Sequence, residues 1–191
     1  MCGRYYIDID EPELREIVRE AEEKARESLG QITVKAGGEI FPTDIVPVRV
    51  GLHQIQPMKW GFVNYAGKPV INARSETALE KPMFQASMTD RRCLVPASGY
   101  FEWKKSEENK RKTKFRFYMP GGFLYFAACY RHEKNSPLPH FVILTRQAAG
   151  GAETIHDRMP VILQERHMDT WFSEGLDALG AGLTDLSYCI A

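Results

Sequence analysis

The chain has 191 residues, of which 43% are hydrophobic, and its 25 basic and 25 acidic residues give a net charge of zero. This length and composition are typical of one soluble domain with its own core, and no overall charge excess indicates a polyanionic partner. The sequence contains neither an apolar run of roughly 18 residues, as a membrane span needs, nor a signal peptide, so we expect a cytoplasmic protein that contacts no membrane.

The first element is the terminal stretch MCGRY, in which Cys2 directly follows the initiator methionine. Methionine is normally removed when the next side chain is small, so a mature chain that begins with Cys2 is expected. Such a terminus carries an α-amine and a thiol on one residue. The α-amine titrates at about 8 and a lysine side chain at about 10.4, so a larger fraction of the terminal amine is an uncharged nucleophile at neutral pH.

Residues 8–30 predict one helix that begins with a capping box and ends at a glycine. Asp10 is the expected N-cap, Glu13 completes the box, and Pro12 fits in the first turn. Gly30 is the expected end of the helix. An apolar stripe at helical spacing is expected to face the core: Leu14, Ile17, Val18, Ala21, Ala25 and Leu29.

Beyond this helix the sequence consists mainly of short runs typical of strands, broken by Gly, Pro and Asn. The expected strand regions are residues 32–36, 45–50, 51–63, 91–105, 113–120, 123–132 and 140–146. Short helices are expected within residues 81–90 and 164–175. Strands joined by tight turns, with few helices between them, predict an α+β fold built mainly on antiparallel sheet, as one domain over residues 1–191.

Three internal stretches combine polar groups with apolar or turn sequence: INARSET (71–77), ASGYFEW (97–103) and TIHDRMP (154–160). In the second, strand alternation puts Tyr100, Glu102 and Lys104 on one face and Phe101 and Trp103 on the other. A partly desolvated Glu102 would have a raised pKa suited to proton transfer, whereas pairing with an Arg or Lys is an equally simple explanation of this acid.

His156 lies in a polar turn, where it could transfer protons near neutral pH or serve a structural role. Asn72 follows an apolar Val-Ile pair, and its amide could orient a hydroxyl or a carbonyl. Residues 89–118 carry nine bases and four acids, a local excess of +5 that is compatible with nucleic acid. The charged run 104–114 within this region is also explained as a solvated hairpin tip.

The four cysteines, Cys2, Cys93, Cys129 and Cys189, are far apart and form no C-x-x-C pair. This spacing argues against a zinc finger and against a disulfide scaffold. Cys93 and Cys129 have apolar neighbours and are expected in the core. The remaining histidines show no metal-ligand spacing, so we expect neither a metal nor another cofactor.

Four motifs, MCGRY, NARSET, CLVPASGYFEWKK and TIHDRMPVIL, occur in this order. Together they resemble the SRAP (SOS-response-associated peptidase) family, over about residues 2–163, with a short helix and tail after residue 163. Members of the family are abasic-site processing proteins of the DNA damage response that crosslink themselves to single-stranded DNA. The resemblance implies a barrel-like, mainly antiparallel sheet with a few flanking helices.

The resemblance also implies roles for individual residues. Cys2 would form a thiazolidine with the ring-opened sugar of an abasic site after removal of Met1. Glu102 would move the proton that opens the sugar, and Asn72 would hold the sugar or the terminus by hydrogen bonding. His156 would assist proton transfer at the Schiff-base stage and in a slower lyase reaction. Removal of Met1 by the protein itself would account for the peptidase label.

DNA contacts are expected from Arg4, Arg74 and Arg158, because guanidinium groups match phosphate oxygens. Trp60 and Pro42 are candidates for an apolar wedge beside the lesion, with core packing as the alternative for Trp60. The expected partner is single-stranded DNA that contains an abasic site, bound by a monomer. Two other functions remain open at this point: a thiol peptidase that uses Cys2 and His156, and a non-covalent reader of modified bases.

Overall fold

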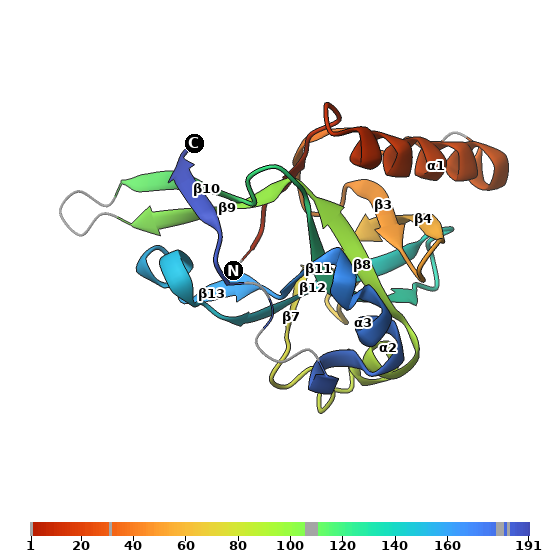
Figure 1. Cartoon of the computed structure of the whole chain (residues 1–191). Coiled ribbons are helices and arrows are strands. Elements are labelled where there is room, and N and C mark those ends of the chain that lie inside the picture. The colour runs from red at the N-terminus through yellow and green to blue at the C-terminus, as the bar shows by residue number, and fades with distance from the viewer. Residues whose placement is uncertain (1, 31, 106–110, 179–181, 183) are drawn as a thin grey trace.

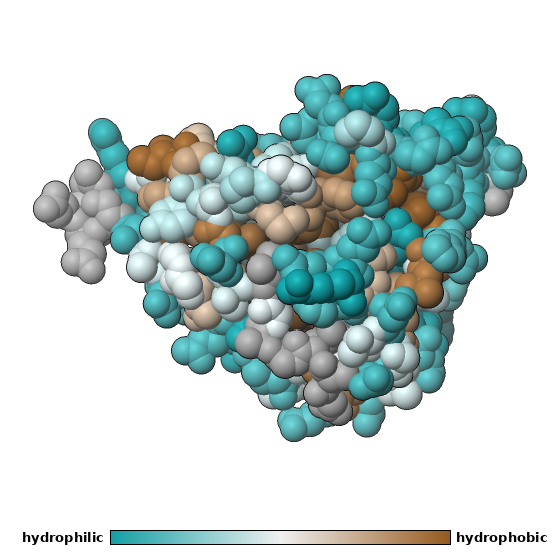
Figure 2. All heavy atoms as spheres, viewed as in Figure 1, coloured by the Kyte–Doolittle hydropathy of each residue, from teal (hydrophilic) through white to brown (hydrophobic). Residues whose placement is uncertain are grey.

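In the computed structural model, which describes residues 2–30, 32–105, 111–178, 182 and 184–191, helix α1 (Pro12–Leu29) forms where the apolar stripe predicts it. Leu14, Ile17, Val18, Ala21 and Ala25 are all buried, and Gly30 ends the helix with a φ of 68°. The helix packs on strands β3 (Ile45–Arg49) and β4 (Ile55–Trp60), and Figure 1 shows it lying across them. Its outward side is hydrophilic, as the teal atoms in Figure 2 show.

The start of α1 differs from the prediction. Glu11, not Asp10, is the N-cap residue, and its side chain makes no capping hydrogen bond. The backbone N–H of Asp10 instead donates to Asp8 Oδ1 at 3.0 Å. The capping box with Glu13 therefore does not form, because the chain enters the helix one residue later than the sequence pattern suggests.

Five strands of the larger sheet close into a ring. The ring runs from β12 (Pro139–Gln147) through β4, β3, β8 (Arg92–Ala97) and β11 (Leu124–His132) back to β12. All pairings in the ring are antiparallel except that of β12 with β4, which is parallel. This arrangement confirms the α+β fold with a barrel-like, mainly antiparallel sheet.

Three short strands extend the ring near the end of β12. Strand β7 (Asn72–Arg74) pairs in parallel with β12, strand β13 (Arg158–Pro160) pairs antiparallel with β12, and strand β14 (Ile162–Leu163) pairs with β11. Thr145 of β12 is in register with Arg74 on one side and with Pro160 on the other. The NARSET and TIHDRMP segments are therefore neighbours in space although about 80 residues separate them in the sequence.

A second, wholly antiparallel sheet has the strand order β15 (Ser187–Ile190), β10 (Lys112–Tyr118), β9 (Gly99–Lys105), β1 (Tyr5–Ile7) and β2 (Gly38–Ile40). The β9–β10 hairpin projects from the body of the molecule (Figure 1). A separate two-stranded ribbon consists of β5 (Phe62–Val63) and β6 (Pro69–Val70). The tip expected within residues 104–114 falls partly on residues 106–110, which lie outside the described residues.

Both faces of the ring are buried, as strand β11 illustrates. Leu124, Phe126 and Ala128 contribute to the core that also contains Cys2 and the inner side of α1. The alternate residues of the same strand contribute to a second apolar cluster, which α2 (Gln85–Asp90) and α3 (Met168–Ser173) cover. Cys93 and Cys129 are buried free thiols on opposite faces, which confirms their expected place in the core. None of the helices formed by the described residues has the length and apolar character needed to cross a bilayer.

Three strand predictions differ from the structure. The run 51–63 forms β4 in the ring and β5 in the separate ribbon, and residues 51–54 belong to no strand. Residues 32–36 are extended but belong to no sheet, although Lys35 donates its backbone N–H to Ile45 O at 2.7 Å. The run 91–105 forms two strands, β8 and β9, because the chain leaves the ring at Ser98 and enters the second sheet at Gly99. The helices expected within 81–90 and 164–175 are confirmed as α2 and as α3 with its preceding 3-10 turn.

Candidate functional site

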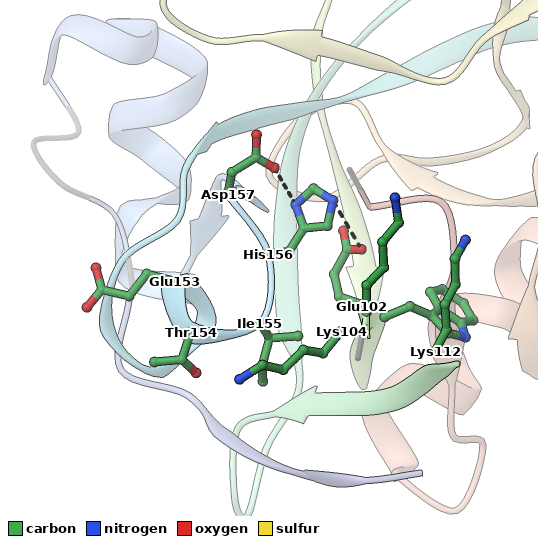
Figure 3. Close-up of a pocket in the computed structure, with 10 residues that line it drawn as sticks. Glu102, Lys104, Lys112, Glu153, Thr154, Ile155, His156 and Asp157 are labelled. Atoms are coloured by element: carbon green, nitrogen blue, oxygen red, sulfur yellow. Dashed lines mark ion pairs between the residues drawn. The ribbon is translucent and has the colours of Figure 1, made fainter. Parts of the chain in front are cut away.

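The fold brings Cys2, Asn72, Glu102 and His156 together at the junction of the two sheets. Cys2 precedes β1, Asn72 begins β7, Glu102 lies in the middle of β9, and His156 follows the 3-10 helix η1 (Gly150–Thr154). The side chain of Asn72 donates from Nδ2 to the Cys2 carbonyl at 2.8 Å. His156 Nε2 lies 4.0 Å from Glu102 Oε2 (Figure 3).

The thiol of Cys2 is fully buried. Its Sγ lies 3.8 Å from the Arg4 carbonyl oxygen, a contact in which the thiol is the donor. Burial, reinforced by the nearby negative charge of Glu102, raises the pKa of the Cys2 thiol above its usual value. The sulfur is therefore a protonated thiol at neutral pH in this arrangement. Met1 lies outside the described residues, so its removal stays a prediction.

Glu102 is a buried acid on the inner face of β9, with 4% of its surface exposed. Burial raises the pKa of its carboxyl, and the charge of His156 opposes this rise. On the other face of the strand, the Lys114 ammonium lies 3.9 Å from the centroid of Phe101 and 6.0 Å from that of Trp103. The alternation in GYFEW therefore predicts the two faces correctly, and it places a carboxyl inside the molecule.

The two ring nitrogens of His156 face different partners. Nδ1 lies 3.0 Å from the backbone nitrogen of Arg158 and 2.7 Å from Asp157 Oδ1. In the neutral ring Nδ1 accepts the Arg158 N–H and Nε2–H points toward Glu102, whereas in the protonated ring Nδ1–H donates to Asp157. Both protonation states thus have a partner at Nδ1. This is the property that a side chain needs in order to take up and release a proton.

One of the two side-chain polar atoms of Asn72 forms a hydrogen bond, and the other has no partner among the described residues. Its Nδ2 holds the Cys2 carbonyl, while its Oδ1 is buried and has no hydrogen-bond partner among the described residues. A buried acceptor without a donor is costly, by about 1–3 kcal/mol. An amine or a hydroxyl brought in beside Cys2 would supply the missing donor.

Arg4 lies at the edge of the site in an aromatic and charged setting. Its Nη1 donates to Glu39 Oε2 at 2.7 Å, and its guanidinium carbon lies 3.7 Å from the ring centroid of Phe41. Lys114 is a second ion-pair partner of Glu39, and together with Arg4 it lowers the pKa of that carboxyl. Phe41 is 41% exposed and precedes Pro42, which is half-buried. Arg4 and Pro42 therefore border an accessible surface.

The guanidinium of Arg158 forms hydrogen bonds within the protein. It forms two bonds to Glu76, at 2.7 Å and 2.8 Å, and a third to the Thr145 carbonyl at 2.6 Å. Only 12% of its side-chain surface is exposed. These bonds tie β13 to β12 and to Glu76, in the segment that follows β7. The expected contact of Arg158 with DNA stays a prediction, in which a phosphate would compete with Glu76 for the guanidinium. Arg74, in contrast, is exposed at the end of β7.

Trp60 is a core residue, so its expected role as a wedge between bases is wrong. None of its surface is exposed, and its Nε1 donates to the Ile71 carbonyl at 2.9 Å. The ring packs against Tyr5 at a centroid distance of 5.2 Å and against Phe141 at 6.3 Å. Its side chain is therefore part of the core cluster and is not accessible to a bound strand.

A cleft opens beside Glu102 and His156 (Figure 3). Lys104 and Lys112 of the β9–β10 hairpin line one side, and Glu153 and Asp157 line the other. Among the described residues, no three His, Cys, Asp or Glu side chains are placed to hold a metal ion. The cleft can therefore offer a carboxyl, an imidazole and lysine cations to a ligand that reaches Cys2.

Sequence reasoning gave no role to several groups that the fold brings to this site. Tyr5 and Tyr100 are buried in the same core cluster as Cys2, and Phe41 and Trp103 flank the Arg4 guanidinium. The alternation in GYFEW placed Tyr100 on the face of Glu102 and was a usable signal for that residue. Tyr5 and Phe41 gave no such signal, because their positions depend on the pairing of β1 with β2 and β9.

The family model described as SOS response associated peptidase (SRAP) matches residues 1–185. Abasic site processing protein YoaM of Bacillus subtilis (strain 168) is 32% identical over 131 residues, which cover 63% of this chain and 57% of that protein. Abasic site processing protein YedK of Escherichia coli (strain K12) is 28% identical over 199 residues, which cover 100% of this chain and 87% of that protein. The chain thus spans 57% of the length of the first of these relatives.

Solved structures share the fold. A protein from Bacteroides thetaiotaomicron superimposes with a TM-score of 0.76 at 20% identity, covering 99% of this chain and 91% of that one. A phage-related protein from Bordetella bronchiseptica superimposes with a TM-score of 0.72 at 22% identity, covering 100% of this chain and 94% of that one. At these identities the likeness establishes the architecture alone.

Proposed function

The chain belongs to the SOS response associated peptidase (SRAP) family, and we propose that it processes abasic sites by forming a covalent crosslink to single-stranded DNA through Cys2. One observation carries this proposal. Asn72 holds the backbone of Cys2 beside a buried acid, Glu102, which His156 faces. The names of the relatives given above, which describe processing of abasic sites, agree with it.

The proposed reaction uses both nucleophiles of a terminal cysteine. An abasic deoxyribose exists partly as an open-chain aldehyde. After removal of Met1, the α-amine of Cys2 adds to the aldehyde carbon, and loss of one water gives an imine. The Cys2 sulfur then attacks the same carbon, the electron pair of the C=N bond returns to nitrogen, and the thiol proton leaves to a base. The product is a five-membered thiazolidine ring.

Glu102 and His156 supply the proton transfers in this scheme. In its protonated form, which burial favours, Glu102 donates to the ring oxygen as the sugar opens; as the carboxylate it accepts a proton from the amine or the thiol. His156 exchanges protons with Glu102 across their 4.0 Å separation. A slower elimination of the 3′-phosphate from the imine, which is a lyase reaction, would use the same groups.

Asn72 positions the reacting terminus. Its Nδ2 fixes the Cys2 carbonyl, and its unpartnered Oδ1 would accept a hydrogen bond from the Cys2 amine or from a sugar hydroxyl. Holding the nucleophile in a reactive geometry is among the largest contributions that a protein makes to such a step.

The DNA strand would follow the accessible edge of the site. Arg74 and the remaining donors of Arg4 would contact phosphates, Lys104 and Lys112 would line the path beside Glu102, and Pro42 would adjoin a base. Because phosphates carry no sequence code and the lesion lacks a base, binding should tolerate any neighbouring sequence.

A thiol peptidase that acts on other proteins is the weaker alternative. Such enzymes need a cysteine whose pKa is lowered, so that the thiolate is present at neutral pH. The Cys2 thiol has a raised pKa instead, because it is buried and lies near Glu102. Removal of Met1 by the protein itself is a single intramolecular event, so it requires a less reactive thiol than repeated cleavage of other proteins does.

The test uses protein that begins at Cys2 and an oligonucleotide with one abasic site, analysed on a denaturing gel. We expect a protein–DNA band for the unchanged protein and for Cys189→Ala, a matched cysteine control outside the site. Cys2→Ala should give no stable band, and Cys2→Ser little. Peptide cleavage without DNA would favour the peptidase, and salt-sensitive binding without a band would favour a non-covalent reader.

A further inference from the structure

Two tyrosine hydroxyls are buried in the core cluster of Cys2 and have no hydrogen-bond partner among the described residues. They belong to Tyr5 and Tyr100, and neither side chain is exposed. Burying a hydroxyl without a partner costs about 1–3 kcal/mol. Buried tyrosines usually avoid this cost by bonding to a carbonyl or a side chain. Tyr125, in the second apolar cluster, also has a buried hydroxyl without a partner among the described residues, but only Tyr5 and Tyr100 lie near enough to Cys2 for its negative charge to raise their pKa.

The strand pairing directs both tyrosines to the inner face of the second sheet. Tyr5 of β1 is directly opposite Tyr100 of β9, so their side chains share a face, and alternation puts Glu102 on that face as well. The two rings pack against a common neighbour, with centroid distances to Phe126 of 5.7 Å for Tyr5 and 6.2 Å for Tyr100. Tyr100 also stacks on Phe117 at 4.8 Å. The rings are therefore held firmly, with the hydroxyls in the core cluster to which Cys2 belongs.

The Cys2 sulfur, in the same core cluster, becomes an anion during the proposed reaction. Its Sγ has a weak 3.8 Å contact with the Arg4 carbonyl, an oxygen that can accept from a thiol but repels a thiolate. Among the ionisable groups of this region, Glu102 repels a thiolate, His156 faces Glu102, and Asp44 acts on Tyr5. Neither carboxylate can donate to sulfur when it is ionised, whereas a tyrosine hydroxyl can.

We propose that the hydroxyls of Tyr5 and Tyr100 donate hydrogen bonds to the Cys2 sulfur as it becomes anionic, and so position and stabilise it for ring closure on the imine. The inference rests on the proposed use of Cys2 as the nucleophile. In this step the S–H bond breaks and its proton goes to Glu102 or His156. The C–S bond then forms as the π bond of the imine breaks and its electron pair goes to the nitrogen, which takes up the proton from Glu102 or His156. The two tyrosines keep their own protons throughout.

The test replaces each hydroxyl by hydrogen, in Tyr5→Phe, Tyr100→Phe and the double variant, all beginning at Cys2. Imine formation is followed by borohydride trapping on an oligonucleotide with one abasic site, and ring closure by the product that survives hydroxylamine without reduction. We expect unchanged imine formation in all three variants. Ring closure should be about tenfold slower in each single variant, since each loses one hydrogen bond to the charged sulfur, and its pH profile should move to higher pH.

Tyr125→Phe is the matched control, because Tyr125 is also a buried tyrosine but packs in the second apolar cluster, away from Cys2. Its rates should equal those of the unchanged protein. Melting temperatures of Tyr5→Phe and Tyr100→Phe should be equal to or above that of the unchanged protein, because each variant removes a hydroxyl that has no partner among the described residues. Unchanged ring closure, an equal loss in both steps, or a lower melting temperature would each overturn the inference.

If the unchanged protein forms no covalent product, the proposed function fails. The hydrogen bonds from the tyrosines to sulfur can then still be tested by the ionisation of the Cys2 thiol. Cysteine labelled with ¹³C at Cβ reports the ionisation of Cys2 as the pH rises. A midpoint moved to higher pH in the two tyrosine variants, but not in Tyr125→Phe, supports the hydrogen bonds to sulfur. Identical titrations in all four proteins exclude them.

Discussion

The environment of Glu102 decides what this carboxyl can do. An exposed glutamate would be ionised at neutral pH, whereas burial on β9 raises the pKa of Glu102 and favours its protonated form. His156, 4.0 Å away, has a partner for Nδ1 in both of its own protonation states. The proposed reaction uses both properties, because opening of the sugar and closure of the ring require proton transfer in opposite directions.

Glu102→Gln should slow formation of the covalent product by about a hundredfold, the lower end of what a general acid–base group contributes. Because the pKa of Glu102 is raised, the rate of the unchanged protein should begin to fall with decreasing pH above 4.5, the ordinary value for this group. The variant should lack this acidic limb. A pH–rate series on a denaturing gel measures both effects, and a variant with the same profile as the unchanged protein would exclude Glu102 from the proton transfers.

At the scale of the elements, β7, β12 and β13 form a unit that holds the Asn72 and His156 segments together. The Arg158 guanidinium of β13 binds Thr145 of β12 and Glu76, which lies in the turn after β7. It also holds the pKa of the Glu76 carboxyl at about 2, below the ordinary 4.5. The folded protein therefore binds this proton less tightly than the unfolded chain does.

This ion pair predicts a stability effect that depends on pH. It contributes stability above pH 4.5, and the contribution is lost as the pH falls from 4.5 to about 2. Glu76→Gln should unfold at lower urea concentration than the unchanged protein at neutral pH, and the difference should shrink across that acidic range. Glu23→Gln, which removes an exposed pair with Arg19 on α1, should change little. A difference for Glu76→Gln that is constant with pH would contradict the assignment.

The turn from β8 into β9 depends on the absence of a side chain at Gly99. A Cβ at this position would lie 2.1 Å from the Phe117 carbonyl oxygen, so β9 and β10 would have to move apart. Gly99→Ala should lower the free energy of unfolding by about 3 kcal/mol, the upper range for overpacking. Gly51→Ala, where a Cβ meets no atom within 4 Å, is the control. Urea titrations that gave equal values for the two variants would show that the hairpin adapts.

Elements with a long repeating pattern could be predicted well from the sequence. Strands that exist only because they pair with a distant strand could be predicted less well. Helix α1 follows from six apolar positions at helical spacing, and only its cap differs. Strands β1 and β15 are three and four residues long and are defined by partners far away in the chain, so no local pattern revealed them. Residues 32–36 have the composition of a strand but belong to no sheet.

The same distinction applies to the site. Cys2, Asn72, Glu102 and His156 could be selected because their motifs carry chemical groups unusual for a scaffold, and the fold brings them together. The contacts that depend on a distant partner could not be predicted. The sequence did not show that Glu76 pairs with Arg158, or that Ile71 accepts the indole N–H of Trp60, which packs in the core as the alternative to a wedge has it.

At the scale of the whole molecule, a net charge of zero implies that DNA binding relies on a few local contacts. With few phosphate contacts, the affinity for undamaged single-stranded DNA should be modest and should fall only gently with salt. Arg74→Ala should reduce the slope of log K against log salt concentration by about 0.7, the value for one contact to a single strand. Fluorescence anisotropy measures this slope. Arg26→Ala, the same charge change on the exposed side of α1, should leave it unchanged, and equal slopes for both variants would remove Arg74 from the interface.

The intact mass of the covalent product tests the central claim most directly. The purified protein is incubated with an oligonucleotide that carries one abasic site and is then analysed by mass spectrometry without reduction. The account predicts the mass of the chain from Cys2 to Ala191 plus that of the oligonucleotide, less one water, with the peptide that begins at Cys2 carrying the adduct. An adduct that retains Met1, or one attached to a lysine peptide, would contradict a crosslink formed by the amine and thiol of Cys2.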